Sequence, residues 1–219
     1  MIRSFVLRSG RRSSAQKRSY EELFPLYGLK PNETGLINTK NLFGNEKPLC
    51  VEIGFGMGKA TIDLALKNPD TNYLGIEVFR SGIGRLLWEI ERNSIQNIRI
   101  IEGDAAEILK SNLIDNTVSA FHVFFPDPWP KKRHHKRRLI KRPFTDILAS
   151  KLKTKAYVYI TTDWADYGDW ILGELSLTTD LVNRYDGFAE HQDWRPQTEF
   201  EQKGLLKKHK IWEVVFEKR

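Results

Sequence analysis

Cysteine is nearly absent from this chain: Cys50 is the only one among 219 residues. A single thiol excludes an intramolecular disulfide framework and fits a reducing compartment, so we expect a cytoplasmic protein. No run of 18 apolar residues occurs, which predicts no membrane-spanning helix and no membrane partner. No spacing of Cys and His matches a zinc site, so we expect no metal. With 40% hydrophobic residues, a chain of this length can bury a full hydrophobic core without disulfides or metal ions to stabilise it.

Acidic residues are missing from two segments. Residues 1–18 carry six Lys or Arg and residues 131–142 carry eight, with no Asp or Glu in either. The formal net charge is +7, so the other 189 residues carry −7 between them. Charge runs are often only solvated faces, but a focused positive charge also attracts a polyanion. Two such runs, one of them beside an aromatic loop, favour a nucleic-acid partner.

The N-terminal segment MIRSFVLRSGRRSSAQKRSY has little apolar surface of its own. We therefore expect residues 1–18 to form a flexible basic arm and residues 19–219 to form a single domain. An acid-free composition rich in Arg and Ser is also typical of organellar transit peptides, which is the alternative interpretation of this segment.

Short apolar runs alternate with helical patterns along the rest of the chain. We expect strands at residues 49–53, 72–78, 98–103, 117–125 and 155–163. We expect helices directly after a glycine-rich turn at 54–58, and over residues 81–93, about 139–153 and about 165–177. This alternation predicts an α/β fold with a mostly parallel central sheet and helices on both faces. The alternating pattern at 211–218 predicts an antiparallel C-terminal edge strand.

The turn after the first strand reads E-x-G-x-G-x-G, with Glu52 ahead of Gly54, Gly56 and Gly58. Glycines there allow positive φ and close approach of the backbone to a ligand, although a tight turn without a ligand is the simpler alternative. The spacing differs from the dinucleotide fingerprint G-x-G-x-x-G. Because Glu52 would repel a phosphate, a cationic or hydroxyl-bearing ligand fits this turn better.

Carboxylates follow the next four strands in turn: Glu77, Asp104, Asp127 and Asp163. The carboxyl ends of parallel strands share one edge of the sheet, so these acids and Glu52 should meet in an acidic crevice. Any one of them alone would more simply be a surface or capping residue. Clustered acids cost free energy unless a cation or hydrogen-bond donors satisfy them.

S-adenosylmethionine fits that crevice as a cofactor, because it carries a sulfonium, an ammonium, a ribose diol and an adenine amine. We expect Glu52 near its amino-acid moiety, Glu77 near its ribose and Asp104 near its adenine. This is the arrangement of Rossmann-like methyltransferases.

The stretch FFPDPWPKKRHHKRRL, residues 124–139, sets Asp127 between two prolines and close to Trp129. Six Lys or Arg and two His follow within eight positions. The prolines stiffen the loop, and Trp129 would stack on a base or, alternatively, only pack against the protein. Neither His134 nor His135 is expected to act as an acid, a base or a metal ligand.

Several segments together resemble one family. RSFVLRSGRRSSAQK, VEIGFGMG, GIEV, FFPDPWPKKRHHKRRL, TTDW and RPQTEFEQKG occur in this order and are similar to hallmarks of the bacterial tRNA (guanine-N7-)-methyltransferases over nearly the whole chain. FPDPWPKKRHHKRR and T-x-F-E are specific, whereas the glycine turn is shared by many methyltransferases. The resemblance implies a Rossmann-like, S-adenosylmethionine-dependent enzyme that methylates N7 of the guanosine at position 46, in the variable loop of tRNA.

The resemblance also implies roles for individual residues. Asp127 would be the catalytic residue. Cofactor contacts would come from Glu52, Gly54, Gly56, Gly58, Glu77, Asp104 and Asp127. Substrate contacts would come from Lys131, Asp163, Thr198, Glu199, Phe200 and Glu201. Further tRNA contacts would come from Arg133, His134, His135, Lys136, Arg137 and Arg138.

The chemistry of guanine agrees with these roles. N7 carries a free lone pair, so no base has to remove a proton before it attacks, and catalysis can rest on positioning and electrostatics. The methylated purine becomes cationic, which the carboxylate of Asp127 would favour. Asp163, or Thr198 with Glu201, would accept hydrogen bonds from guanine N1–H and N2–H₂ and so exclude adenine. The cations after Asp127 would bind the flanking phosphates.

Two other functions are open at this point. Asp127-Pro128-Trp129 loosely resembles the D-P-P-Y loop of methyltransferases that act on exocyclic amines of nucleic acids, although the second proline is missing and a basic run follows. The second alternative is a non-catalytic RNA-binding module with the same fold. The intact acids at the strand ends argue against it. The sequence leaves monomer and homodimer undecided.

Overall fold

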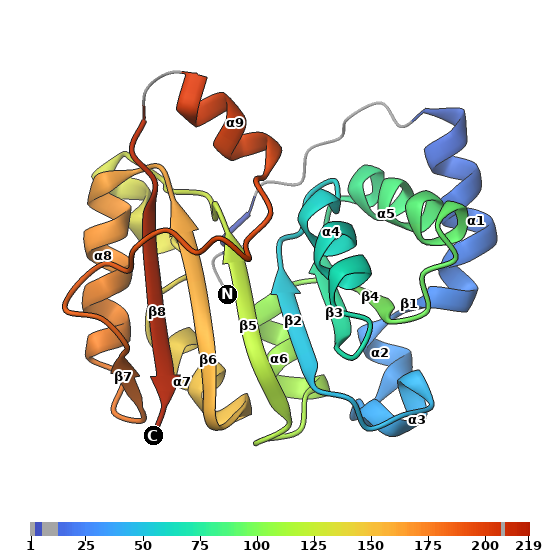
Figure 1. Ribbon diagram of the computed structural model, residues 1–219, viewed down its shortest axis with the longest axis horizontal. Helices are drawn as coiled ribbons and strands as arrows, with labels where there is room; N and C mark the ends of the chain where they lie inside the picture. The colour runs from blue at the N-terminus through green and yellow to red at the C-terminus, as the bar shows by residue number, and fades with distance from the viewer. Residues whose placement is uncertain (1–2, 6–12, 207–208) are drawn as a thin grey trace.

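The computed structural model describes residues 3–5, 13–206 and 209–219. Within them the sheet has eight strands in the order β1-β4-β3-β2-β5-β6-β8-β7 (Figure 1). The strands are β1 (Gly28–Leu29), β2 (Leu49–Ile53), β3 (Asn72–Glu77), β4 (Ile98–Glu102), β5 (Val118–Phe124), β6 (Leu152–Thr162), β7 (Leu181–Asn183) and β8 (Trp212–Lys218). The α-helices are α1 (Ser14–Tyr27), α2 (Pro31–Thr34), α3 (Thr39–Phe43), α4 (Lys59–Lys67), α5 (Arg80–Arg92), α6 (Ala105–Asn112), α7 (Phe144–Lys151), α8 (Ala165–Ser176) and α9 (Glu199–Leu206), and a 3₁₀ helix, η1, spans Lys132–Arg137.

The parallel part of the sheet reverses its strand order between β2 and β5. From β2 the chain moves outward through β3 and β4 on one side, and β5 and β6 continue on the other side. In open α/β sheets, ligands bind outside the carboxyl ends of the strands at such a switch point. The topology therefore places the candidate site at the upper ends of β2 and β5 in Figure 1.

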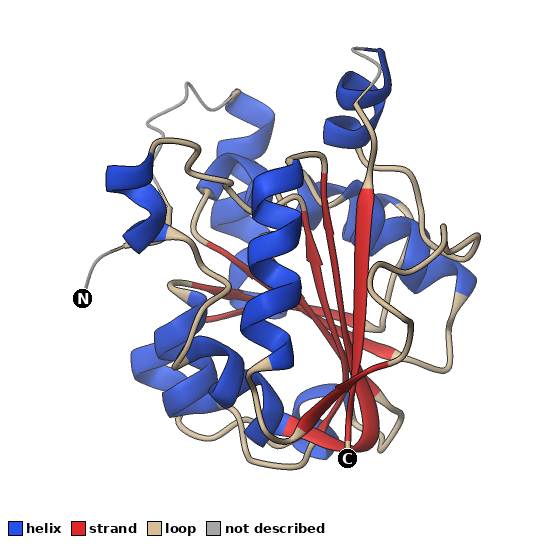
Figure 2. Cartoon of the chain, turned by 90° about the vertical axis from the view of Figure 1, so that its left-hand side faces the viewer, coloured by secondary structure: helices blue, strands red, loops and turns tan. Residues whose placement is uncertain are grey.

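Helices cover both faces of the sheet, as Figure 2 shows with the sheet seen nearly edge-on. Successive residues of β2 point to opposite faces, so Cys50 packs with the layer under α4 and α5 while Val51 packs with the layer under α6, α7 and α8. Every residue of β2 is buried. The predicted α/β fold, mostly parallel and covered on both faces, is confirmed.

Two predicted elements need correction. The helix predicted at about 139–153 begins only at Phe144, because Pro143 cannot continue a helix from the preceding residues and stands at its N-cap. The C-terminal strand β8 is antiparallel to β6, as predicted, but it is not at the edge. The short strand β7 pairs with its outer side, with Leu181 opposite Lys218.

The N-terminal arm also ends earlier than predicted. Residues 14–18 belong to α1, which Ser13 caps: its hydroxyl accepts from Gln16 N, and the Gln16 side chain accepts from Ser13 N. The helix then packs against α5, where the absent side chain of Gly84 lets the backbone of Gln16 approach. Residues 6–12 of the predicted arm lie outside the described residues. No helix in the described part of the chain is long and apolar enough to cross a bilayer.

Candidate active site

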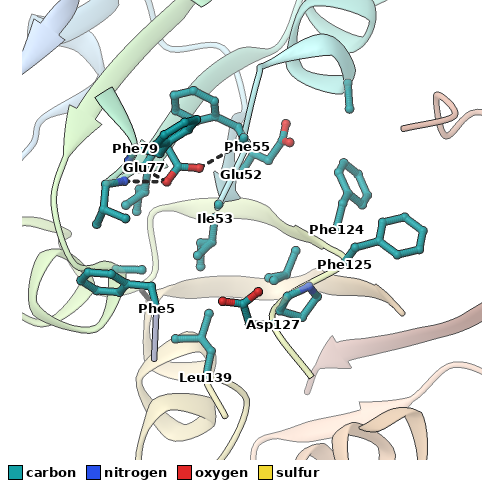
Figure 3. A pocket seen from close by; sticks show the side chains of 18 of the residues that line it. Phe5, Glu52, Ile53, Phe55, Glu77, Phe79, Phe124, Phe125, Asp127 and Leu139 are labelled. Atoms are coloured by element: carbon teal, nitrogen blue, oxygen red, sulfur yellow. Dashed lines mark hydrogen bonds between the residues drawn. The ribbon is translucent and has the colours of Figure 1, made fainter. Parts of the chain in front are cut away.

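A cavity of about 410 Å³ opens at the switch point between β2 and β5. Its size is typical of a small-molecule site. Its walls come from the glycine turn, the end of β3, the loop after β5, Ser4, Phe5 and Thr198, which directly precedes α9. Figure 3 labels ten of the lining residues, among them Phe5, Glu52, Glu77, Phe124, Phe125, Asp127 and Leu139.

The glycine turn has the conformation that its sequence predicts. Gly54, Gly56 and Gly58 have φ values of 75°, 58° and 79°, a region that favours glycine. The turn ends where Gly58 caps α4. A side chain at Gly82, on α5, would run into the carbonyl oxygen of Gly56, so a second glycine lets the helix approach.

Glu77 is fixed by the backbone around it. Its Oε2 accepts from Gly56 N at 2.8 Å, and its Oε1 accepts from Val78 N at 2.7 Å and Phe79 N at 3.0 Å. Burial raises the pKa of Glu77, these N–H groups lower it, and the charge of Asp127 raises it further. A carboxylate held in this way at a strand end is oriented to accept from ligand hydroxyls.

Glu52 is a buried acid on the wall of the same cavity, 2% exposed. Its Oε2 accepts from the Thr61 hydroxyl at 2.8 Å. Burial raises its pKa to about 7, and the neighbouring Glu77 adds to that effect. A cation bound beside Glu52 would favour the ionised form.

Asp127 lies across the cavity from Glu77 (Figure 3). The residues that bracket its loop, Phe125 and Trp129, have positive φ values of 52° and 46°. Such conformations cost about 1 kcal/mol or more per residue and persist where the surrounding structure enforces them. The loop thus presents Asp127 to the cavity at a local cost in stability.

Residues 3–5 lie against this loop. Phe5 points into the cavity (Figure 3) and Ser4 also lines it. The indole N–H of Trp129 donates to the carbonyl of Ser4 at 2.9 Å, and Arg137 Nε donates to the carbonyl of Arg3 at 3.3 Å. The Arg137 guanidinium lies 4.1 Å from the centre of the Trp129 ring. Trp129 is therefore packed between protein groups, with its indole N–H already bonded.

Two of the predicted crevice acids do not line the cavity. Asp104 caps α6, its Oδ1 accepting from Ala106 N at 2.9 Å, although its neighbours Gly103 and Ala105 do line it. Asp163 Oδ2 lies 3.1 Å from His209 Nδ1. The predicted contacts of Asp104 with adenine and of Asp163 with guanine stay predictions.

The motif at the start of α9 contributes Thr198 to the cavity. Glu201, in contrast, is 4% exposed, and both of its oxygens accept from Arg195, one of them at 2.6 Å from Nη2. Arg195 Nη2 also donates to Glu213 at 3.2 Å. The carboxylate of Glu201 is thus occupied by the protein, and its predicted bond to guanine does not fit this arrangement. The side chains of Glu199 and Phe200 lie outside the described residues.

The basic segment after the loop divides into exposed and buried members. Lys131, Lys132, Arg133 and Lys136 are exposed on or beside η1. His134 and His135 are half-buried, His134 against Trp129 and His135 against Trp170. Arg138 is 1% exposed. Its predicted contact with RNA is therefore wrong for this structure, because the side chain is enclosed by α8.

Sequence reasoning missed several residues of the site. Phe124, Phe125 and Leu139 belong to the quoted aromatic and basic stretch, and the place of Phe124 and Phe125 at the end of β5 could have predicted cavity contacts. Phe5 belongs to the quoted segment RSFVLRSGRRSSAQK, but nothing in the sequence placed it beside the cavity or indicated the pairing of Arg195. Among the described residues, no group of three or more His, Cys, Asp or Glu is placed to hold a metal ion.

Comparisons with known proteins agree on one family. A family model described as a putative methyltransferase matches residues 46–214. The tRNA (guanine-N(7)-)-methyltransferase of Nitrosospira multiformis is 46% identical over 218 residues, covering 100% of this chain and 95% of that protein. The protein of the same description from Chromobacterium violaceum is 44% identical over 218 residues, covering 100% and 96%.

Solved structures show the same fold at low sequence identity. The 16S rRNA methyltransferase KamB aligns with a TM-score of 0.60 at 10% identity, over 82% of this chain and 92% of that one. An antibiotic-related methyltransferase aligns with a TM-score of 0.53 at 18% identity, over 87% and 98%.

The two relatives are 46% and 44% identical over 218 residues, and each covers 100% of this chain. The family predicted from the sequence motifs is thereby confirmed: this chain belongs to the tRNA (guanine-N(7)-)-methyltransferase family.

Proposed function

We propose that this protein transfers the methyl group of S-adenosylmethionine to N7 of a guanosine in tRNA, at position 46 of the variable loop. One observation carries the proposal. The cavity at the switch point holds Glu52 and Glu77 on one side and Asp127 on the other, and the loop of Asp127 runs directly into exposed cations.

The residues of the cavity fit the cofactor. The desolvated carboxyl of Glu52 suits a positively charged amino-acid group, and Glu77, oriented by three backbone N–H groups, suits the ribose hydroxyls. The positive φ of the glycine turn lets its backbone approach the ligand. S-adenosylmethionine, when bound, supplies the electrophilic methyl group.

Asp127 supplies the electrostatic part of catalysis. Guanine N7 has a lone pair and needs no deprotonation, so the protein has to orient the base and favour the positive charge that develops on it. Asp127 stands in the cavity with its charge close enough to Glu77 to raise the pKa of that residue. Phe124 and Phe125, at the end of β5, provide apolar walls for a purine.

Exposed cations of the basic segment bind the RNA backbone. Lys131, Lys132, Arg133 and Lys136 follow the Asp127 loop and face solvent. Phosphate contacts of this kind fix the position of the nucleic acid without reading its sequence. We assign base recognition to the cavity and backbone binding to this segment.

The test is methylation of bulk tRNA in vitro with methyl-labelled cofactor, followed by nucleoside mass spectrometry. We expect label in 7-methylguanosine, and none when Asp127→Asn protein of the same thermal stability is used for the same short time. Label in an N-methylated exocyclic amine would support the amine-methyltransferase alternative. Cofactor binding absent in calorimetry would support the non-catalytic RNA-binding alternative.

A further inference from the structure

Arg138 has the surroundings of a core residue although it lies in the most basic stretch of the chain. Its side chain is 0% exposed. The guanidinium carbon lies 4.9 Å from the ring centres of both Tyr167 and Trp170, which belong to α8. Arginine stacks on aromatic faces in this way because its charge is delocalised and weakly hydrated.

The hydrogen bonds of Arg138 join two parts of the site. Its Nη2 donates to Asp166 in the first turn of α8, and its Nε donates to the carbonyl of Pro128 at 3.0 Å. Pro128 directly follows Asp127. The buried guanidinium therefore connects α8 with the loop that carries the acid of the cavity.

The same face of α8 also binds the chain at Ile140, shortly after the basic stretch. Trp170 Nε1 donates to the carbonyl of Ile140 at 2.7 Å, and the Tyr167 hydroxyl accepts from Ile140 N at 3.3 Å. The stretch between Asp127 and Ile140 is thus fixed to α8 at both ends. Phe125 and Trp129 keep their unfavourable positive φ values only if surrounding contacts hold the loop, and these bonds to α8 are such contacts.

We propose that Arg138 is a positioning residue, whose buried guanidinium ties the Pro128 carbonyl to α8 and thereby sets where the Asp127 carboxylate stands in the cavity. The inference rests on the proposed function. It gives two arginines of the basic segment different roles: the exposed Arg133 contacts the RNA, and the buried Arg138 fixes the loop of Asp127 to α8.

The test measures the methylation rate and the affinity for tRNA separately. Arg138→Lys keeps a positive charge beside Asp166. It lacks the planar guanidinium group that binds the Pro128 carbonyl and stacks against two rings. Arg138→Met also removes the charge, and it leaves no buried acid unpaired because the Asp166 side chain is 62% exposed. Arg133→Ala, at an exposed cation of the same segment, is the matched comparison, and Lys153→Ala, an exposed cation beyond α7, is the control.

We expect Arg138→Lys to lower the single-turnover rate at saturating tRNA about tenfold or more, since small displacements of catalytic groups cost up to about a hundredfold. Arg138→Met should lower it further, so that lysine acts as a partial rescue. The dissociation constant of tRNA and its salt dependence should stay at wild-type values for both. Arg133→Ala should instead weaken tRNA binding and flatten its salt dependence, and Lys153→Ala should change neither quantity.

Two results would overturn the inference. The first is Arg138→Lys at the wild-type rate. The second is loss of tRNA affinity and salt dependence in Arg138→Lys to the extent seen in Arg133→Ala, which would make Arg138 an RNA contact. If Arg138→Met does not fold in thermal unfolding, the lysine variant decides alone. A wild-type protein that does not methylate tRNA would contradict the proposed function itself, and the inference with it.

Discussion

The two halves of the carboxyl edge hold their acidic residues in different ways. On the side of β2 and β3, Glu77 accepts from three backbone N–H groups, all of them in turns that directly follow these strands. On the side of β6 and α9, the acids pair with side chains instead: Asp163 with His209, and Glu201 with Arg195. The first half is built from the backbone of the sheet, the second from contacts between separate segments.

This difference matches the two ligands of the proposed reaction. Backbone groups at strand ends are rigid, so they pre-organise a site for a small cofactor. The partly exposed pair of Asp163 with His209 can exchange its partners, which suits a surface that has to accept a large RNA, whereas the buried pair of Glu201 with Arg195 holds α9 to the segment before it. The Asp127 loop stands between the halves, and Arg138 joins it to α8.

The largest effect, on the methylation rate, is expected for Asp127, whose loop stands between the two halves. Asp127→Asn keeps the size of the side chain and removes its charge, so the single-turnover methylation rate should fall about a hundredfold or more, the scale of a lost electrostatic contact in a transition state. The dissociation constant of tRNA should change much less. A rate within about threefold of wild type, under ~1 kcal/mol, would remove Asp127 from the mechanism, provided that thermal unfolding is unchanged.

The side of β2 and β3 can also be tested at Glu52, a buried acid that accepts from the Thr61 hydroxyl. Its pKa in the folded protein is raised from 4.5 to about 7, so folding favours the protonated form and the protein loses stability as pH rises through that interval. Glu52→Gln should match wild type at pH 5 and be more stable at pH 8, by up to about 3 kcal/mol. Thermal unfolding without cofactor at both pH values checks this. If Glu52→Gln changes the stability equally at pH 5 and pH 8, Glu52 is ionised in the folded protein at both pH values.

Glu77→Ala should weaken cofactor binding by about 1–3 kcal/mol, because it removes a charge-assisted hydrogen bond to the ribose. Binding of tRNA should barely change, since Glu77 belongs to the other half of the edge. Calorimetry with S-adenosylmethionine measures the first quantity. The exposed acid Glu91, on α5, provides the matched control as Glu91→Ala. An unchanged cofactor affinity in Glu77→Ala would contradict the ribose assignment.

The smallest effect is expected for single exposed cations of the basic segment. Arg133→Ala should flatten the plot of log K for tRNA against log[salt] by about 0.7–0.9 units, the contribution of one phosphate contact. The atom that is methylated should not change, because the base is read in the cavity. Salt plots parallel to those of wild type would mean that Arg133 only faces solvent.

The side of β2 and β3 could be predicted from sequence, because each of its residues is placed by a local pattern of strand, turn and helix. Glu52, the three glycines and Glu77 stand at strand ends, and a strand followed by a helix fixes their place at the edge of the sheet. The capping box at Ser13 and Gln16 was equally local, and it would have shown that α1 begins inside the predicted arm.

The other half could not be predicted in the same way. Arg138 looks like one more cation of a basic run, and its burial depends on Tyr167 and Trp170, about 30 residues further along the chain. Glu201 looks like an available acceptor until Arg195 is placed beside it by the fold. Side-chain packing decided which charges face the ligand, across about 30 residues for Arg138 but only six for Glu201, and neither periodicity nor spacing predicts such packing.

Mapping of the methylated atom tests the central claim most directly. Transfer RNA incubated with the protein and S-adenosylmethionine is treated with borohydride and aniline, which cleave the chain at 7-methylguanosine, and the fragments are sized. We predict one new cut, at position 46 in the variable loop, that is absent after incubation with Asp127→Asn protein for the same short time. Methyl incorporation without strand scission, or a cut at another position, would contradict the account.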